Sequence, residues 1–379
     1  MDCIAIIDSG LYAIYWQNDT IWRRKYNGTW SNATKIIEDV LQDFSANLYQ
    51  DSVEILCSDV SGLIKKVVFD GSNVTISENL NAQTLHNAQY WVTNYQNLSH
   101  MIYTIPALGH TGHVLVSQTQ GDAEFSPAVR MDGISPICGG KDRFFKPIFV
   151  ADGHHLIFYQ LWQEERARPI FGLGFSENKI AYREIFHGKI GRQNIFFNTH
   201  DQLVCCAFLA TKHSIHGLFA SRGMFGYRLV YKNIINEKMH ETVLAEGPQI
   251  IHNTAIYIVD GVLHLAFMQG DALYTATLEE IHTPVVKLAS RPEKLIKKAK
   301  FLAISDAFLA DEVLVHKSKP WEILLFDSNI FSMAKVKSSI KIQPCDTKEE
   351  KTEEYDDFFD NMEDELRAFG SFEERYKNN

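Results

Sequence analysis

One pattern recurs seven times along this chain of 379 residues: an apolar strand runs into a turn at an aspartate or asparagine, and a second apolar strand follows. The turns lie at Asp8, Asp51, Asn97, Asp152, Asp201, Asp260 and Asp311. Successive turns are about 43 to 59 residues apart. Hairpins that recur with a period near 50 residues are typical of a ring of four-stranded sheets. The pattern therefore predicts an all-β fold that is set by repetition.

Each repeat carries signals for two more strands. A third apolar run follows the hairpin and often ends in tight-turn residues, such as Asn27 with Gly28 or Asp70 with Gly71. A fourth, more polar run comes after it. The first-to-second and third-to-fourth turns of such units lie on one face of the ring, here named the hairpin face. The second-to-third and fourth-to-first connections lie on the opposite, connecting face. Loop lengths vary on the connecting face, so we predict that function lies there.

The repeat resembles those of the β-propeller superfamily over residues 1 to about 338. The resemblance implies a seven-bladed propeller, with six or eight blades as alternatives. It indicates no particular family, because the Gly-His and Trp-Asp marks of WD40 proteins and the kelch double glycine are missing at repeat spacing. β-Propellers serve many unrelated functions, so the fold implies no activity. No strand is predicted to be exchanged between the chain ends, so the ring is expected to close by face-to-face packing alone.

The cysteines and the apolar runs predict the compartment. None of the six cysteines forms a Cys-x-x-Cys pair, and no charged N-terminal segment precedes an apolar core of secretory type. No apolar run approaches the roughly 18 residues that a membrane-spanning helix needs. We therefore predict a cytoplasmic protein with reduced thiols and no membrane span. The net charge of -10 gives no indication of nucleic-acid binding.

Residues 343–379 form an acidic tail, with 13 acidic and 5 basic residues. The rest of the chain is nearly neutral, so we place a propeller at residues 1–342 and a separate tail at residues 343–379. Apolar residues recur in the tail at intervals of three and four, namely Tyr355, Phe358, Phe359, Met362 and Leu366. This spacing predicts an amphipathic acidic helix. The helix either docks on its own propeller or enters the groove of a partner protein.

Cationic and imidazole side chains gather in the loops of the third, fourth and fifth repeats. The candidate binding residues there are His110, His113, Arg143, Trp162, Arg166, Arg168, Arg192, Lys212 and His213. Arginine and lysine side chains near glycine-rich backbone suit the recognition of carboxylates or phosphates. These residues predict a binding patch for an acidic protein or ligand. An ordinary solvated loop surface is the alternative.

No motif in the sequence supports catalysis. The Ser-x-Asp-x-Gly-x-x-Trp box of sialidases is absent, as are a nucleophile elbow, a phosphate-binding loop and a His-Glu-x-x-His helix. The histidine pairs at His110 and His113 and at His213 and His216 lack a further zinc ligand at a recognised spacing. We predict no catalytic residue, no metal site and no cofactor. The chain is expected to be a non-enzymatic interaction scaffold with a protein partner. A carbohydrate-binding or sialidase-like glycan-processing propeller is the alternative.

Overall fold

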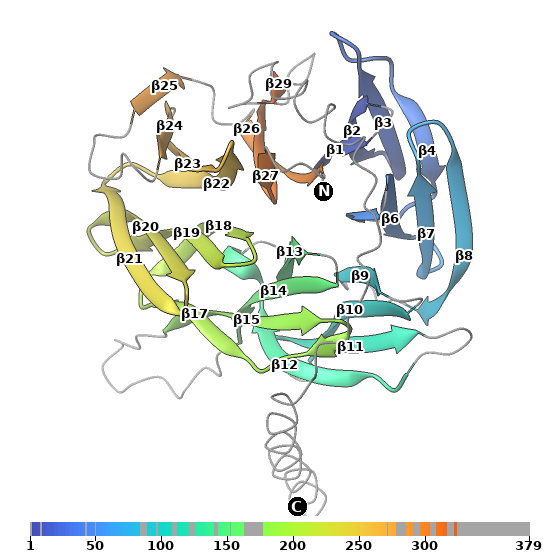
Figure 1. Ribbon diagram of the computed structural model, residues 1–379, viewed down its shortest axis with the longest axis horizontal. Helices are drawn as coiled ribbons and strands as arrows, with labels where there is room; N and C mark the ends of the chain where they lie inside the picture. Colours follow the sequence, from blue (N-terminus) through green and yellow to red (C-terminus); the bar gives the residue numbers. More distant parts are fainter. Residues whose placement is uncertain are drawn as a thin grey trace, which may run out of the picture. The chain divides into compact units, whose positions relative to one another are not determined.

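In the computed structural model, residues 1–339 form one compact unit (Figure 1). The structure describes residues 2–323 except 8–9, 42–43, 50, 84–88, 96–97, 108–111, 121–125, 140–142, 152, 163–176, 271, 278–285, 291–295, 304–307 and 317–321. Several predicted residues lie outside this range: His110, Arg166, Arg168, Tyr355, Phe358, Phe359, Met362 and Leu366. The tail helix to which the last five belong stays a prediction.

The described strands follow one another in antiparallel groups. The first groups are β1 (Asp2–Ile7), β2 (Gly10–Gln17), β3 (Thr20–Tyr26) and β4 (Thr34–Glu38); β5 (Ser45–Tyr49), β6 (Ser52–Ser58), β7 (Leu63–Phe69) and β8 (Val74–Gln83); and β9 (Tyr90–Tyr95), β10 (Leu98–Pro106), β11 (His113–Gln120) and β12 (Val129–Ser135). A short 3-10 helix, η1 (Ile137–Gly139), precedes β13 (Phe145–Ala151), β14 (His154–Leu161), β15 (Asn178–Phe186), β16 (Lys189–Ile190) and β17 (Asn194–Thr199).

The later groups follow in the same way, with one exception in the last group. They are β18 (Gln202–Ala210), β19 (Ser214–Gly223), β20 (Gly226–Ile235) and β21 (Lys238–Gly247); β22 (Ile251–Val259), β23 (Val262–Gln269), β24 (Ala272–Thr277) and β25 (Val286–Ser290); and β26 (Ile296–Ala303), β27 (Phe308–Ala310), β28 (Glu312–His316) and β29 (Glu322–Ile323). In the last group β27 pairs with β22 of the preceding group, and β28 pairs with β26, so Asp311 does not connect two paired strands. Figure 1 shows these groups following one another around a common centre in chain order. In the described part of the chain, no helix is long and apolar enough to cross a membrane.

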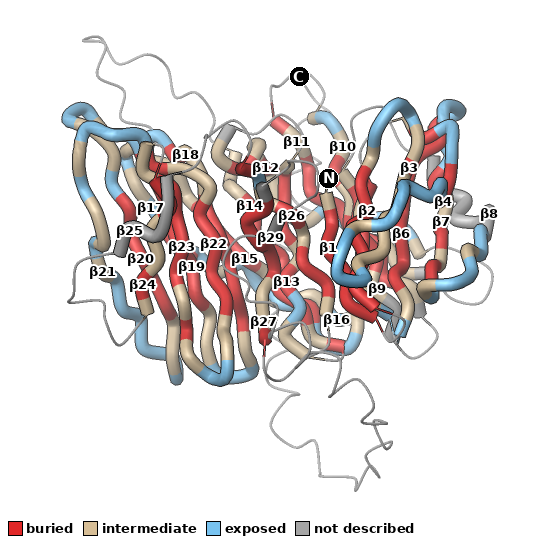
Figure 2. Tube along the Cα trace, turned by 90° about the horizontal axis from the view of Figure 1, so that it is seen from above, coloured by how far each residue is buried: buried red, intermediate tan, exposed pale blue. Residues whose placement is uncertain are grey.

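The first strand of each group is the innermost. Strand β13 contacts β18, β18 contacts β22, and β22 contacts β26. Five of the six residues of β1 are buried, whereas the outer strand β21 has no buried residue. Figure 2 shows buried residues along the inner strands and exposed residues at the turns. Apolar side chains of neighbouring groups therefore pack around the centre, and the predicted all-β propeller fold is confirmed.

The inner strands of the first and last groups also close the ring by hydrogen bonds. Strand β1 pairs in parallel with β26, in a register that runs from Cys3 opposite Lys300 to Ile6 opposite Ala303. The predicted closure by face-to-face packing alone is therefore wrong. Two inner strands that run in the same direction can join their edges, and such a parallel ladder satisfies backbone groups that side-chain packing would leave unpaired.

The turn at Asp201 has a different role from the one predicted. Strand β17 pairs with β15, and β18 pairs with β19, so Asp201 connects two groups rather than two strands of one hairpin. The side-chain amide of Asn178, at the start of β15, donates to the Asp201 carbonyl at 2.9 Å. The strand order in the fifth group is therefore shifted by one strand. An aspartate turn in the sequence indicates that the chain reverses direction, but it does not indicate which strands pair with each other.

Aromatic rings fill the core between the fourth and fifth groups. Phe158 stacks on Phe208 with ring centroids 4.2 Å apart, and Phe197 stacks on Phe219 at 4.0 Å. Gly217 on β19 lies under these rings, because a Cβ atom there would come within 2.4 Å of the Phe196 ring. The glycine lets the strand backbone approach the aromatic layer closely.

Candidate functional site

The structure places the predicted binding patch on two opposite faces. Trp162 follows β14 on the connecting face, where its backbone N–H donates to the Gly133 carbonyl at 3.0 Å. Arg192 lies between β16 and β17, which is a third-to-fourth turn on the hairpin face. Lys212 and His213 lie between β18 and β19, a first-to-second turn on that same hairpin face. The shift at Asp201 explains why the predicted residues do not come together.

The predicted residues on the connecting face make packing contacts. The Arg143 guanidinium donates to Glu312 Oε1 at 2.7 Å. The His113 ring packs on Phe144 with centroids 3.9 Å apart, and burial lowers the pKa of His113. The Trp162 indole covers Gly112 so closely that a Cβ atom there would lie 2.7 Å from the ring. These contacts support a structural role for the three side chains. Arg192, Lys212 and His213 are exposed.

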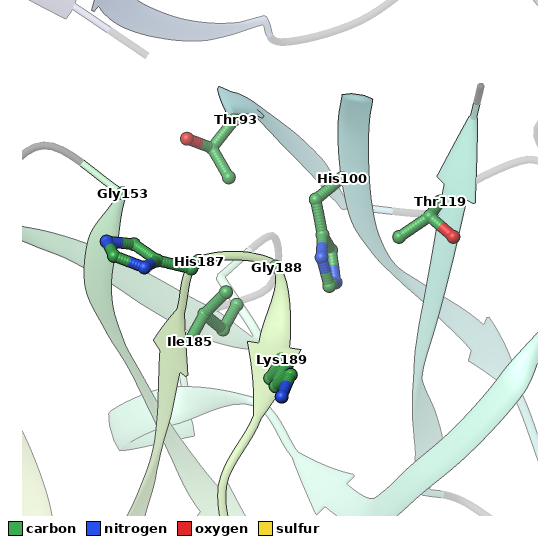
Figure 3. A pocket seen from close by; sticks show the side chains of 8 residues that line it. All are labelled: Thr93, His100, Thr119, Gly153, Ile185, His187, Gly188 and Lys189. Carbon is green, nitrogen blue, oxygen red and sulfur yellow. The ribbon is translucent and has the colours of Figure 1, made fainter. Parts of the chain in front are cut away.

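A pocket of about 110 Å³ opens between the β9–β12 and β13–β17 groups (Figure 3). Its lining residues are Thr93, His100, Thr119, Gly153, Ile185, His187, Gly188 and Lys189. Gly153 belongs to the turn after β13, and His187 and Gly188 form the turn after β15, so the pocket lies on the hairpin face. One water molecule needs roughly 10–15 Å³ of such volume. The pocket therefore has room for part of a small polar ligand.

His100 is the most buried polar side chain of the pocket, at 2% exposure. Its Nε2 lies 2.7 Å from the Ser117 hydroxyl, and its Nδ1 has no hydrogen-bond partner of good geometry among the described residues. Burial lowers the pKa of His100, and the nearby Gly188 backbone opposes this effect. The ring is therefore neutral near pH 7. A buried polar atom without a partner is costly, and a ligand that hydrogen-bonds it removes that cost.

An exposed aromatic residue lies next to the pocket residues in sequence. Phe186, between the lining residues Ile185 and His187, is 49% exposed. Its ring stacks on the His187 ring at a centroid distance of 4.1 Å and makes an edge contact with His154 at 5.4 Å. Successive side chains of a strand point to opposite faces, so Phe186 points away from the face on which Ile185 lines the pocket. The sequence did not predict this pocket, because its residues come from separate repeats.

A buried ionic cluster lies among the inner strands. Glu312 Oε2 accepts from Lys146 Nζ at 2.8 Å and from Lys298 Nζ at 3.3 Å, and Oε1 accepts from Arg143. Burial raises the pKa of Glu312, but the charges of these three cations outweigh burial and hold that pKa well below its usual range. Glu312 is 6% exposed. The cluster therefore joins β13, β26 and β28 through charges that water does not screen.

The described residues contain no group of three or more histidine, cysteine, aspartate and glutamate side chains that could hold a metal ion. No protein-family model and no curated protein matches the sequence.

Several solved structures are similar to this chain. A fucose-binding lectin from the fungus Aleuria aurantia, described as a six-bladed β-propeller, has 11% identity and a TM-score of 0.45, and the match covers 77% of this chain and 96% of the lectin. AofleA from Arthrobotrys oligospora has 9% identity and a TM-score of 0.44, with coverage of 82% and 88%. A puromycin-hydrolysing peptidase of Mycobacterium tuberculosis has 9% identity and a TM-score of 0.47, with coverage of 86% of this chain and 52% of the peptidase. The propeller fold of this chain rests on its own strand pairing.

Proposed function

We propose that this chain is a carbohydrate-binding β-propeller and that the pocket around His100 holds a sugar group. The observation that supports this proposal is the buried imidazole of His100, whose Nδ1 has no hydrogen-bond partner of good geometry among the described residues and lies near the Gly188 backbone. Thr93 and Thr119 line the same pocket. These groups can donate to and accept from sugar hydroxyls. The side chain of Ile185, which also lines the pocket, offers an apolar surface for the C–H face of the sugar.

The charge at the pocket favours an acidic sugar. Lys189 lines the pocket and is exposed. An ammonium group at the pocket attracts a carboxylate or sulfate, and the described lining residues include no aspartate or glutamate. The sequence also predicted an acidic ligand. We keep that ligand in the proposal, but we place its binding site on the hairpin face instead of the connecting face.

Screening the full chain on a glycan array tests this proposal, followed by calorimetry with the best ligand. Thr119→Val is expected to weaken binding about 2- to 13-fold, since one neutral hydrogen bond contributes about 0.5–1.5 kcal/mol. Thr242→Val on β21 is the matched control and should leave the affinity unchanged. Lys189→Gln should weaken acidic glycans more than neutral ones. An array without any bound glycan, or equal affinities for Thr119→Val and Thr242→Val, would reject the proposal.

We also propose that the propeller has seven blades. The groups β1–β4, β5–β8, β9–β12, β13–β17, β18–β21, β22–β25 and β26–β29 support this number. On the basis of the sequence, we further propose that the protein is cytoplasmic and that residues 343–379 form an amphipathic helix.

Protein interaction is a second candidate function, and the β19–β20 turn favours it. Met224 is 83% exposed and Phe225 is 94% exposed at the tip of this hairpin. The turn lies beside Asp201, since a Cβ atom at Gly223 would come within 2.8 Å of the Asp201 carboxylate. It therefore lies on the connecting face, where the sequence predicted partner binding. Adjacent apolar side chains with this exposure are typical of docking surfaces.

Replacing Met224 and Phe225 together with serine tests this second function. The double variant is expected to lose any partner that wild type retains in a pull-down, at an unchanged melting temperature. Met239→Ser, on the half-exposed Met239 of β21, is the control and should retain the partner. Equal retention by the double variant and wild type would exclude the hairpin as a docking site.

A further inference from the structure

Two cysteines from distant parts of the chain lie in contact near the ionic cluster. The Cys138 thiol donates to Cys206 Sγ at 3.6 Å, although the two residues are 68 positions apart. Cys138 belongs to η1 and has a left-handed backbone, with φ of 54°. Cys206 lies on the inner strand β18 and is 2% exposed, whereas Cys138 is partly exposed. Both are free thiols.

The surroundings of Cys206 carry excess positive charge. Lys146 Nζ donates to the Cys206 carbonyl at 3.1 Å, and Lys298 Nζ donates to the same oxygen at 2.7 Å. Glu312 is the shared carboxylate of these two ammonium groups. Two lysines and Arg143 thus face one glutamate, which leaves a net positive charge beside the sulfur. Positive charge in a buried site favours a thiolate over a thiol.

The pKa values of the two cysteines move in opposite directions. The hydrogen bond from Cys138 lowers the pKa of Cys206 to about 7, against the effect of burial and with the help of Lys146 and Lys298. The same hydrogen bond raises the pKa of Cys138, and burial adds to it. Near pH 7 about half of the Cys206 thiols are therefore ionised, whereas Cys138 keeps its proton.

The other described cysteines lack these features. Cys205 precedes Cys206 on β18, so its side chain points to the opposite face of the strand. It accepts a hydrogen bond from Thr254 Oγ1 at 3.7 Å, and burial raises its pKa. Burial also raises the pKa values of Cys3 and Cys57 to about 12. Cys205 is therefore a control on the same strand that has different partners and is less buried than Cys206.

We propose that Cys138 and Cys206 form a redox-active dithiol that reacts with hydrogen peroxide. The Cys206 thiolate attacks one peroxide oxygen, the O–O bond breaks, and the leaving hydroxide takes a proton and departs as water. Cys206 is then a sulfenic acid. The Cys138 sulfur attacks the Cys206 sulfur, the S–O bond breaks, and the hydroxyl leaves with the Cys138 proton as a second water. Two thiols and one peroxide thus become one disulfide and two water molecules.

The geometry favours a small oxidant and a short closing movement. Cys206 is too deeply buried for a bulky disulfide to reach, whereas peroxide is little larger than water. A disulfide bond is about 2.05 Å long, so the sulfurs must approach by roughly 1.5 Å from their present separation. Cys138 lies in a connection between strands and not in a sheet ladder, so its side chain can supply this movement at little cost in backbone pairing.

Peroxide titration of the full chain tests the proposal. The protein is treated with increasing hydrogen peroxide, quenched with N-ethylmaleimide and mapped by peptide mass spectrometry. A Cys138–Cys206 disulfide should form at lower peroxide than any modification of Cys3, Cys57 or Cys205. Its rate of formation should rise with pH as the Cys206 thiolate forms, with the midpoint of the rise at about pH 7.

Two variants separate reactivity from packing. Cys138→Ser removes the resolving thiol, so Cys206 should accumulate as a sulfenic acid that dimedone traps. Cys205→Ser should form the disulfide as wild type does. If Cys206 reacts no faster than Cys205 in the wild-type chain, or if folded Cys138→Ser gives no dimedone adduct at Cys206, the proposal is rejected.

Discussion

Glu312→Ala is expected to lower the free energy of unfolding by about 3–5 kcal/mol, because it leaves buried cations without their shared carboxylate. Lys146 and Lys298 both bind Glu312 Oε2, and their side chains are 9% and 12% exposed. Neither ammonium group can reach bulk water from its buried position on β13 or β26. The loss should appear as a lower midpoint in urea denaturation with a nearly unchanged slope.

The exposed pair between Arg228 and Glu246 is the control for this prediction. Its atoms are 2.9 Å apart, close to the separations in the buried cluster, but the side chains are 47% and 63% exposed. Glu246→Ala should therefore cost at most about 1 kcal/mol, since exposed ion pairs contribute little. A loss in Glu312→Ala no greater than that in Glu246→Ala would show that the buried cluster does not stabilise the ring.

Local sequence patterns predicted the hairpins well. Five of the predicted turns connect strands that pair with each other: Asp8, Asp51, Asn97, Asp152 and Asp260 lie between the strands of β1–β2, β5–β6, β9–β10, β13–β14 and β22–β23. Alternating apolar residues beside a turn residue carry this information within about a dozen positions. The all-β propeller fold follows from repeating it.

Strand pairing between groups could not be predicted in the same way. The segment that became β17 carries the apolar run Ile195, Phe196 and Phe197 before Asp201, which is the pattern of an inner strand. Pairing with β15 made it an outer strand, and this reversed the face of Lys212 and His213. Only tertiary contacts decide between the two assignments.

The pocket and the ionic cluster depend on still longer separations. Lys146 and Glu312 are 166 positions apart, and no local sequence pattern predicts that they form an ion pair. His100 resembles an ordinary strand residue until the turn at Gly188 comes beside it. Local sequence patterns therefore predict the strands, whereas the pocket and the ionic cluster form where strands of different groups meet.

Acid is expected to destabilise the fold well before its carboxylates titrate, and His155 is a principal cause. Burial lowers the pKa of His155 from 6.5 to about 3, and the charges of His154, Lys300 and His100 add to this effect. The folded state thus holds His155 neutral, whereas the unfolded chain binds a proton below about pH 6.5. The stabilisation is complete above that pH and is lost as the pH falls from about 6.5 toward 3. At pH 5, about 1.5 units below the unfolded pKa, His155 alone accounts for about 2 kcal/mol of lost stability.

His155→Phe is expected to remove that share of the pH dependence. The ring lies between Trp91 and Phe149, at centroid distances of 5.0 and 5.5 Å, and its Nδ1 has no hydrogen-bond partner among the described residues. Phenylalanine can therefore occupy the same aromatic site without a titrating group. Urea denaturation at pH 7.5 and pH 5 should show a difference in unfolding free energy that is about 2 kcal/mol smaller than in wild type. His240→Phe, at an exposed position of β21, should keep the wild-type difference. If His155→Phe also keeps it, the proton that destabilises the fold in acid binds elsewhere, and His216, whose pKa burial lowers to about 4, becomes the next group to replace.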